Sequence, residues 1–554
     1  FMLASDIATE DYGHVYGFNL VYSGNHYGSA EKSARDIVRV SAGINPHLFE
    51  WTLCGGEAFE TPEAVLTFSD GGFNGMSRNM HAFVNDHIVR GQWKGKERPI
   101  LFNNWEATFF DYNEGKLLQL AKTAKELGAE LFVLDDGWFG ERNSDEAGLG
   151  DYDVNKKKFP RGLRHFADKI REMGMDFGLW FEPEMVNPDS KLYRAHPEYA
   201  VTHPDKKPVL GRNQLVLDLC RKEVRDYIVE NVGCIIDEAG ASYVKWDMNR
   251  NISEACSPAL PKQGEFYHRY IMGLYDILGR IFEKRPHILL ESCASGGNRF
   301  DLGMLCYSPQ IWTSDDTDPI ERLKIQGGLS YFYPPSAMGA HVSQSPHQQT
   351  LRDTPLSTRF NVACFGCLGY ELDLRFLTPE EKKEIKEQVE FYRKYRKVFQ
   401  YGRFTRVRDA AGKDNKVIWQ STSDDGEIAL TGFFQTMTNA AESDDRLIVK
   451  GLKPGRYTVR TRPQRLFIKR FGGLMKHVLP VELNPDGFIM RMANRLYSLA
   501  DCVEEYECSN RALEAGIPLK SQFMGTGYNE NVRMLGDFGS NIYITASRSP
   551  DCEN

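Results

Sequence analysis

The chain has 554 residues, which is enough for two or three domains and a large hydrophobic core. Its formal net charge of −8 at pH 7 argues against a nucleic-acid-binding surface. No apolar run reaches membrane-spanning length and no signal peptide is visible, so we expect no contact with a membrane.

The sequence contains 11 cysteines, an odd number scattered along a long chain. This usage favours a reducing compartment over a disulfide scaffold, and we therefore expect a cytoplasmic protein. Cys364 and Cys367 form a single C-x-x-C motif in a stretch that is typical of a packed helix, and no second pair completes a zinc site. We interpret them as structural thiols and expect neither a metal nor an organic cofactor.

Residues 1–95 are rich in glycine and in residues that favour β-strands, as in Val15–Ser23 and Leu66–Ser69. We interpret this region as part of an N-terminal β-sandwich domain.

From residue 96 to residue 400, short apolar runs alternate with amphipathic helical stretches. We expect eight strands here: Ile100–Trp105, Leu131–Asp135, Phe177–Phe181, Gln214–Leu219, Tyr243–Trp246, Ile288–Glu291, Gln310–Thr313 and Ala337–Val342. The helices expected between them include Gly115–Leu127, Arg161–Met173, Arg221–Glu238, Glu265–Lys284 and Pro319–Leu329. This alternation predicts an α/β fold of the (β/α)8 TIM-barrel type. A doubly wound sheet is the alternative, but no glycine-rich phosphate turn follows the first strand.

A charged helix is predicted to begin at Pro379 and to run to Val398. Beyond it, residues 401–554 alternate strand-like runs with turns, as in Lys416–Gln420 and Arg456–Arg460. This pattern predicts a C-terminal β-sandwich domain. The expected architecture is therefore a barrel flanked by β-sandwich regions at both ends.

Charged side chains follow the ends of the predicted barrel strands. Lys245 and Asp247 lie two residues apart at the end of the predicted strand Tyr243–Trp246. Burying such ions is costly unless they are paired. A structural ion pair is the simpler interpretation of these two residues alone. Three further strand ends also carry carboxylates, and TIM barrels place their functional side chains at these ends.

The strand ends combine several tryptophans and carboxylates with one lysine and no histidine cluster, so metal-dependent hydrolysis is not indicated. Paired carboxylates in a pocket with aromatic walls are the arrangement that cleaves glycosidic bonds. The residues concerned are Trp105, Glu106, Asp135, Asp136, Trp138, Trp180, Glu182, Glu184, Lys245, Asp247, Asn249, Arg250, Cys293, Asp315, Asp316 and Asp318.

Five motifs carry a resemblance to a known family: Leu134-Asp-Asp-Gly-Trp-Phe-Gly140, Gly178-Leu-Trp-Phe-Glu-Pro-Glu-Met185, Lys245-Trp-Asp-Met-Asn-Arg250, Glu291-Ser-Cys-Ala-Ser-Gly-Gly297 and Trp312-Thr-Ser-Asp-Asp-Thr-Asp318. Together they resemble glycoside hydrolase family 36, a family of retaining α-galactosidases. The resemblance extends to residues 17–24 and 103–106 upstream and to residues 525–528 and 536–540 downstream. It implies hydrolysis of terminal α-galactosyl residues from melibiose- or raffinose-type sugars by double displacement.

The resemblance also implies roles for single residues. Asp247 is similar to the family's nucleophile and Asp315 to its general acid/base, with Asp316 as the competing assignment for the acid. The other matching residues resemble sugar contacts: Asp135 and Asp136 at the galactose O4 and O6 hydroxyls, Lys245, Arg212 and Asn249 at further hydroxyls, Cys293 and Gly296 at the rim beside O2, and Trp180 and Trp105 as pocket walls.

Two physical arguments support the roles that the resemblance implies for Asp247 and Asp315. Lys245 and Arg250 would favour the ionised form of a nucleophilic Asp247. Crowding by the two acids that follow Asp315 in the sequence would help it to keep its proton.

Some of these residues also have structural interpretations. Arg212 could pair with a surface carboxylate, and Cys293 could be a small buried hydrophobe. We interpret Glu182 and Glu184 as structural partners rather than catalysts, because Pro183 fixes a turn between them.

Several other functions remain open. The rim beside Cys293 decides between an α-galactosidase and an α-N-acetylgalactosaminidase, and a transglycosylase resembling raffinose synthase is also possible. A Schiff-base aldolase would use Lys245, whereas a galactose-binding protein would have an incomplete site. The resemblance implies small α-galactosides as partners and a homo-oligomer, a tetramer. Only the last third of the family's N-terminal sandwich is matched, so we expect an N-terminally shortened chain.

Overall fold

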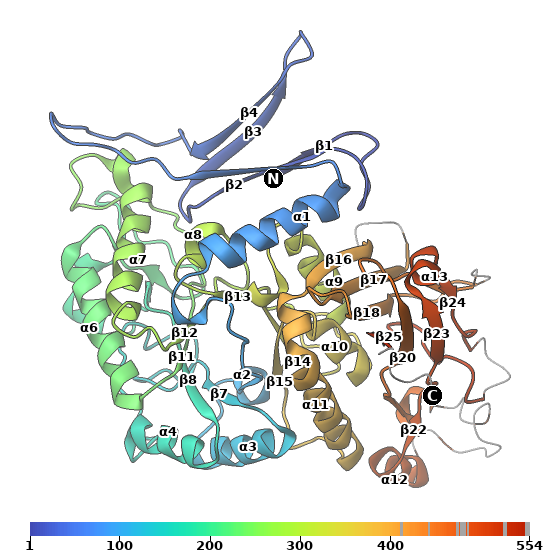
Figure 1. Ribbon diagram of the computed structural model, residues 1–554. Helices are drawn as coiled ribbons and strands as arrows, with labels where there is room; N and C mark the ends of the chain where they lie inside the picture. Colours follow the sequence, from blue (N-terminus) through green and yellow to red (C-terminus); the bar gives the residue numbers. More distant parts are fainter. Residues whose placement is uncertain are drawn as a thin grey trace.

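The structure, a computed structural model, describes residues 1–409, 414–440, 444–472, 476, 484, 487–523 and 529–548. The downstream motif at residues 525–528 lies outside them. Figure 1 shows a β-rich N-terminal region, a central barrel with its helices and a C-terminal sheet side by side. Among the described helices, none combines the length and apolar character that a membrane span requires.

Eight parallel strands close into a barrel at the centre of the molecule (Figure 1). They are β6 (Leu101–Asn103), β7 (Leu131–Leu134), β8 (Asp176–Phe181), β11 (Tyr243–Trp246), β12 (Leu289–Ser292), β13 (Gln310–Trp312), β14 (Met338–Ser343) and β15 (Cys367–Glu371). Apart from Asp176, all their side chains are buried, which explains why they form continuous apolar runs in the sequence. The predicted TIM barrel is confirmed.

One predicted barrel strand is wrong. In residues 214–219 only Leu215–Val216 (β10) is a strand, and it pairs antiparallel with Met185–Val186 (β9) outside the barrel. The eighth barrel strand is β15 instead. The sequence hides it because helix α10 (Leu356–Ala363) directly precedes it and both elements are entirely buried, so no periodicity separates them.

This arrangement also corrects the interpretation of the C-x-x-C motif. Cys364 ends α10 and Cys367 begins β15, so the motif spans a helix end and a strand start rather than one helix. Both cysteines are buried and free.

The helices that connect the barrel strands lie close to their predicted positions. They include α3 (Glu114–Leu127), α4 (Gly162–Glu172), α6 (Lys222–Ala239), α7 (Phe266–Phe282), α9 (Pro319–Leu329) and α11 (Pro379–Tyr401), with the shorter α2 (Trp105–Thr108), α5 (Lys191–Ala195) and α8 (Leu302–Leu305). Side-chain caps fix several starts: Asn113 accepts from the amide of Lys116, and Thr378 and Glu381 form a capping box.

The N-terminal region consists of small antiparallel sheets. Strands β1 (Met2–Ala4), β2 (Val15–Leu20) and β5 (Ala64–Ser69) form one sheet, and β3 (His26–Lys32) and β4 (Val38–Ile44) form a hairpin that extends away from the barrel (Figure 1). Helix α1 (Gly72–Phe83) leads from this region towards the barrel.

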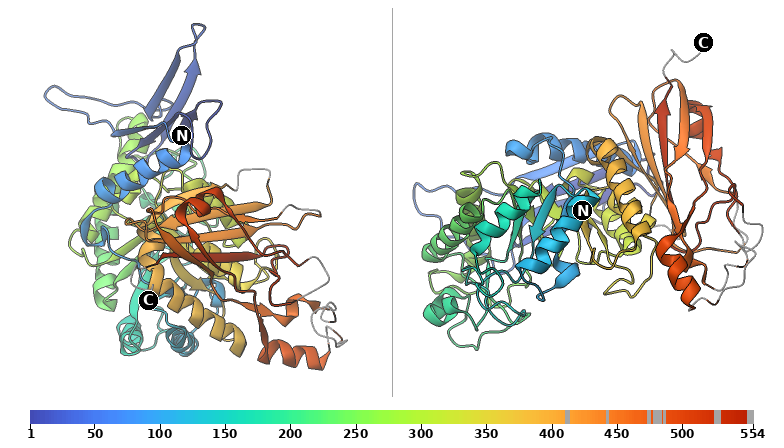
Figure 2. Two further views of the ribbon diagram at one scale, coloured as in Figure 1. Left: turned by 45° about the vertical axis from the view of Figure 1, so that its right-hand side comes forward. Right: turned by 90° about the horizontal axis from the view of Figure 1, so that it is seen from below.

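The C-terminal region is built on a six-stranded antiparallel sheet beside the barrel (Figure 2). Its strands, in order across the sheet, are β16 (Arg403–Arg408), β17 (Lys416–Thr422), β18 (Ile428–Gln435), β25 (Ser540–Ser547), β20 (Arg456–Thr461) and β23 (Glu505–Ser509). Shorter elements accompany it: β19 (Arg446–Leu447), β21 (Arg465–Phe467), β22 (Ser498–Ala500), β24 (Ile517–Pro518), α12 (Phe488–Leu496) and α13 (Asn510–Ala515). The side chain of Asn361 in α10 donates to Ser540 Oγ at 2.9 Å and so ties the sheet to the barrel.

Arg406 joins all three regions. This fully buried side chain of β16 donates to Glu10 Oε2 at 3.1 Å, to Ser77 Oγ of α1 at 2.9 Å and to the carbonyl of Ser330 at 3.0 Å. Its guanidinium also lies 3.8 Å from the ring centre of Tyr331. The buried charge is thus paired and hydrogen-bonded, as burial of an ion requires.

Gly369 in β15 provides a test of the barrel closure. A Cβ at this position would lie 2.4 Å from His341 Cδ2 and 2.8 Å from Leu101 Cδ1. We expect Gly369→Ala to destabilise the protein by about 1–3 kcal/mol, because overpacking displaces neighbouring core side chains. Thermal unfolding followed by circular dichroism measures the change. Gly43→Ala is the matched control, since a Cβ there meets no atom within 4 Å, and equal melting temperatures of the two variants would contradict the expectation.

Candidate active site

A cavity of about 140 Å³ opens at the C-terminal ends of the barrel strands. Parallel strands bring these ends to one face of the barrel, so residues far apart in the sequence meet there. The lining consists of Trp105, Glu106, Asp135, Asp136, Trp180, Glu182, Arg212, Lys245, Asp247, Asn249, Trp312, Asp315, Thr317, Gln348, Gln349 and Glu371.

Lys245 of β11 is buried in the pocket and pairs with Asp135, which follows β7, over the intervening strand β8. Its Nζ is 3.1 Å from Asp135 Oδ2, and Asn103 Nδ2 donates to the same oxygen at 2.7 Å. Burial alone would lower the pKa of Lys245, but the carboxylates of Asp135 and Glu371 contribute to raising it well above its usual value. This lysine is therefore a fixed cation, which disfavours the aldolase alternative, because a Schiff-base lysine must be neutral to attack.

Asp136 has a separate partner. Arg142 Nε and Nη2 donate to its two carboxylate oxygens at 2.9 and 2.8 Å, and both side chains are buried. Burial raises the pKa of Asp136, and Arg142 opposes that shift. Because Asp135 and Asp136 are held by different cations, each presents its carboxylate to the pocket in a fixed orientation.

Asp247 follows β11, and its carboxylate accepts three hydrogen bonds. Trp180 Nε1 and Asn249 Nδ2 donate to Oδ2 at 3.2 and 2.7 Å, and the amide of Met248 donates to Oδ1 at 2.9 Å. Such donors stabilise a carboxylate and fix its direction.

Asp315 follows β13, and Trp312 Nε1 donates to its Oδ1 at 2.9 Å. The residue as a whole is exposed, but the protein that surrounds its carboxyl group displaces much of the bulk water there. This desolvation and the nearby charge of Asp247 raise the pKa of Asp315. Asp315 therefore holds a proton more readily than a free aspartic acid.

Asp316 does not line the pocket. Its Oδ1 accepts from the amide of Asp318, and Asp318 caps α9 and pairs with Arg352 at 2.7 Å. The predicted crowding of Asp315 by these two acids is wrong as a cause of its raised pKa. Desolvation and Asp247 replace it, because the loop turns successive side chains in different directions.

Arg250 does not support Asp247 as predicted. Its Nη1 donates to the backbone carbonyls of Val209 and Gln214 at 2.8 and 2.7 Å, and it is absent from the pocket lining.

The turn Glu182-Pro-Glu184 after β8 holds the residues on both sides of Asp247. Glu182 Oε1 accepts from the amide of Asn249 at 2.8 Å, and Glu184 Oε1 accepts from Trp246 Nε1 at 2.9 Å. Burial, followed by the charge of Asp247, raises the pKa of Glu182 to about 8. The two glutamates thus brace the segment that carries Asp247, and Glu182 also faces the pocket.

The structure brings most of the predicted sugar contacts together, including Trp105, Trp180, Arg212 and Asn249. Cys293 and Gly296 lie outside the lining. The thiol of Cys293 is buried, and burial together with Asp247 raises its pKa well above the usual value. Gly296 has φ +88°, and a Cβ there would lie 2.6 Å from Ser314 Cα, so this glycine permits close packing beneath the loop of Asp315.

Sequence reasoning missed part of the lining, namely Trp312, Thr317, Gln348, Gln349 and Glu371. Glu371 ends β15, the strand that the sequence does not reveal, and burial raises its pKa to about 8. Gln348 and Gln349 lie in the loop after β14 and carry no charge that would single them out. Among the described residues, no group of three histidine, cysteine, aspartate or glutamate side chains is arranged to hold a metal ion.

Two family models match the chain. The model described as Melibiase matches residues 58–402, and the one described as the glycosyl hydrolase family 36 N-terminal domain matches residues 1–54. The chain belongs to glycoside hydrolase family 36. Membership accounts for the closed barrel and for the acidic pocket at its C-terminal face.

Similar family 36 proteins are known from bacteria. Alpha-galactosidase AgaA of Geobacillus stearothermophilus is 49% identical over 452 residues, 81% of this chain and 62% of that protein. Alpha-galactosidase Mel36A of Lactobacillus acidophilus is 47% identical over 457 residues, 82% of this chain and 62% of that protein. The chain therefore spans less than two thirds of the length of these relatives.

Solved structures agree with the fold. The crystal structure of AgaA has a TM-score of 0.86 at 42% identity and covers 99% of this chain and 69% of its own. The alpha-galactosidase of Lactobacillus brevis has a TM-score of 0.88 at 40% identity and covers 100% of this chain and 69% of its own.

The burial of Glu182 has a consequence for stability. Its pKa is about 8 in the folded chain against 4.5 for the free side chain, so between these values the unfolded chain binds fewer protons and this group makes stability fall as pH rises. We expect Glu182→Gln to weaken that fall, because glutamine keeps an acceptor for Asn249 but has no proton to lose. Melting temperatures across this pH range measure it. The exposed Glu60→Gln is the matched control, and a pH slope identical to that of the unaltered chain would contradict the raised pKa.

Proposed function

We propose that this chain carries a retaining α-galactosidase activity that releases terminal α-D-galactosyl residues from melibiose- and raffinose-type oligosaccharides. The observation that carries the proposal is that Asp247 and Asp315 line one small pocket rather than two. The names of the curated relatives support it, and related AgaA variants have been solved in complex with raffinose and with stachyose.

In the proposed mechanism, Asp247 attacks the anomeric carbon while Asp315 donates its proton to the leaving oxygen. The glycosidic bond breaks, and a covalent β-galactosyl ester forms on Asp247. Asp315, now ionised, takes a proton from water as that water attacks the anomeric carbon. Galactose leaves with the α configuration, because two inversions restore it. The raised pKa of Asp315 and the three donors around Asp247 suit these two roles.

Asp135 and Asp136 are proposed to accept hydrogen bonds from the O4 and O6 hydroxyls of galactose. Lys245 and Arg142 already occupy one side of each carboxylate, so the positions left for a sugar hydroxyl are few and fixed. A site built this way discriminates against a sugar whose hydroxyl points elsewhere, because the carboxylate would then be left unpaired. The site thereby distinguishes galactose, whose O4 is axial, from glucose, whose O4 is equatorial.

Galactose is favoured over N-acetylgalactosamine. The cavity measures about 140 Å³, well below the roughly 300 Å³ at which ligand pockets usually begin. The thiol of Cys293 lies outside the lining, so the pocket does not extend to it. The small volume of the pocket favours galactose over a sugar that carries an acetamido group at C2.

We further propose that the chain divides into three domains, at residues 1–95, 96–400 and 401–554. We also propose that it assembles as a tetramer and is located in the cytoplasm. Exposed apolar side chains on the N-terminal sheet, at Tyr16, Leu66 and Phe68, support a contact between subunits. All cysteines that the structure describes are free, which suits a reducing compartment.

A panel of nitrophenyl glycosides tests the function. We expect the α-galactoside to be hydrolysed, with α-galactose as the first product seen by NMR, and the α-N-acetylgalactosaminide to be a poor substrate. Asp247→Asn should lose several orders of magnitude in turnover with the fold intact, because the nucleophile is gone. Asp316→Asn is the matched control, since that side chain does not line the pocket and instead accepts from the amide of Asp318. β-Galactose as the first product, or comparable turnover in Asp247→Asn, would reject the proposal.

The acid role of Asp315 has its own test. We expect Asp315→Ala to lose most activity on raffinose but much less on a dinitrophenyl α-galactoside, whose leaving group needs no proton. Steady-state kinetics on both substrates measure the difference, and added azide should restore turnover by replacing the base. An equal loss on both substrates would place the acid at another residue.

A further inference from the structure

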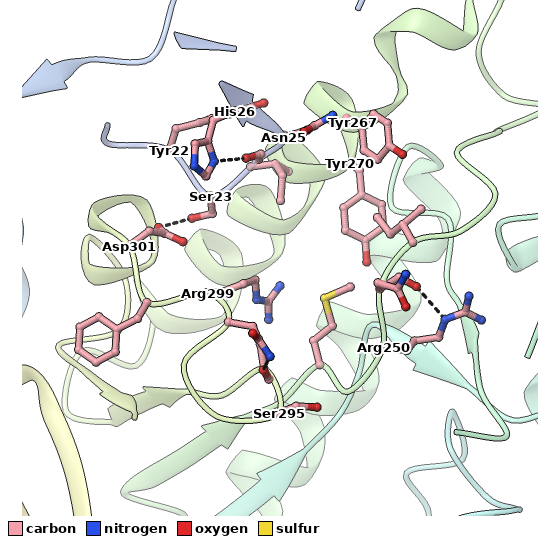
Figure 3. A pocket seen from close by; sticks show the side chains of 18 of the residues that line it. Tyr22, Ser23, Asn25, His26, Arg250, Tyr267, Tyr270, Ser295, Arg299 and Asp301 are labelled. Carbon is pink, nitrogen blue, oxygen red and sulfur yellow. Dashed lines mark hydrogen bonds between the residues drawn. The ribbon is translucent and has the colours of Figure 1, made fainter. Parts of the chain in front are cut away.

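We propose that a second, larger cavity beside the catalytic pocket binds a neutral oligosaccharide without cleaving it. This cavity has a volume of about 840 Å³, within the range of about 300–1,000 Å³ that is typical of ligand sites. It lies between the turn after β2, the loops after β11 and β12, and helix α7 (Figure 3). Tyr22, Met248, Tyr267, Tyr270, Arg299 and Phe300 are among its lining residues.

The charged groups of the cavity already have partners within the protein. Arg299 Nη2 lies 2.9 Å from Glu184 Oε1, and Asp301 accepts from Ser23 Oγ at 2.7 Å. Arg250 donates to the backbone carbonyls described above. Because the protein itself occupies these groups, the cavity suits a ligand that binds through neutral hydrogen bonds.

The remaining surface combines aromatic rings with amides and hydroxyls. Tyr267 projects from α7, and its hydroxyl has no hydrogen-bond partner within the described part of the chain. Asn25, Asn251 and Ser295 add short polar groups from three separate loops. Flat apolar faces alternating with neutral hydrogen-bonding groups match a sugar, which presents C–H faces and hydroxyls in the same alternation.

Arg299 forms part of the cavity wall. Its side chain is about nine-tenths buried and pairs with Glu184, and Figure 3 shows it pointing into the same space as Tyr270. Its Nε has almost no accessible surface, so a ligand meets this side chain as wall and not through that nitrogen.

The two cavities are neighbours with a common wall. Asn249 belongs to both linings, and Ser295 Oγ in the larger cavity donates to Asn249 Oδ1 at 3.0 Å. The larger cavity contains neither Asp247 nor Asp315, so it has no catalytic pair of its own. A saccharide held there lies close to the reaction but is not consumed by it.

Saturation-transfer NMR with maltotriose tests the proposal, because this neutral trisaccharide contains no galactose for the catalytic pocket to bind. We expect saturable binding that weakens about fivefold in Tyr267→Ala, since one stacking ring contributes about 1 kcal/mol. Tyr497→Ala is the matched control, because that tyrosine is 64% exposed and lies in the C-terminal region. Absence of saturable binding, or equal binding in Tyr267→Ala, overturns the proposal.

Two further measurements keep the result interpretable. Tyr267→Ala should retain its melting temperature and its hydrolysis of a nitrophenyl α-galactoside, so lost maltotriose binding is separated from lost folding and from failure of the proposed enzyme activity. In addition, crystals of the unaltered chain soaked in maltotriose should show the sugar against Tyr267 and Tyr270. Sugar density only at other places on the chain overturns the assignment.

Discussion

The buried ion pair between Lys245 and Asp135 is the interaction on which the active-site pocket depends. The pocket collects seven carboxyl groups, and in a low-dielectric interior so many like charges repel strongly. Lys245 places one positive charge in their midst, 3.1 Å from Asp135. Burial opposes the charge of Lys245, but the acidic side chains around it, Asp135 foremost, raise its pKa well above the usual value. Removing the lysine would leave an uncompensated buried anion, which costs far more than the pair itself contributes.

The carboxyl groups around this lysine differ in their surroundings, and their protonation differs with them. Burial raises the pKa of Glu106, Glu182 and Glu371 to about 8 in each case, so near neutral pH these groups are largely uncharged. They add hydrogen-bonding capacity without adding repulsion. Asp247 instead accepts three hydrogen bonds, and Asp315 accepts one and has a raised pKa. One chemical group thus occupies three different environments, and these suit the acid, nucleophile and supporting roles proposed above.

The sequence predicted the barrel and the acidic strand ends because both follow from local patterns. Parallel buried strands are continuous apolar runs, and the first polar residues after them must lie at one face. The errors arise where a pattern is ambiguous or where direction matters. Strand β15 follows a buried helix with no polar boundary, so Glu371 was missed with it. Asp316 and Arg250 are sequence neighbours of pocket residues but point elsewhere, because a loop directs successive side chains to different sides.

The segment that carries Asp247 is also the partition between the two cavities, and this limits how they can be separated by mutation. Glu184 accepts from Trp246, next to Asp247, and pairs with Arg299 of the larger cavity. Replacing Arg299 would leave Glu184 as a buried carboxylate without its cation and would disturb Trp246 as well. Tyr267 has no such connection: it lies on α7, on the far side of the larger cavity. A substitution there alters the second cavity alone, which is why binding and catalysis can be judged independently in this protein.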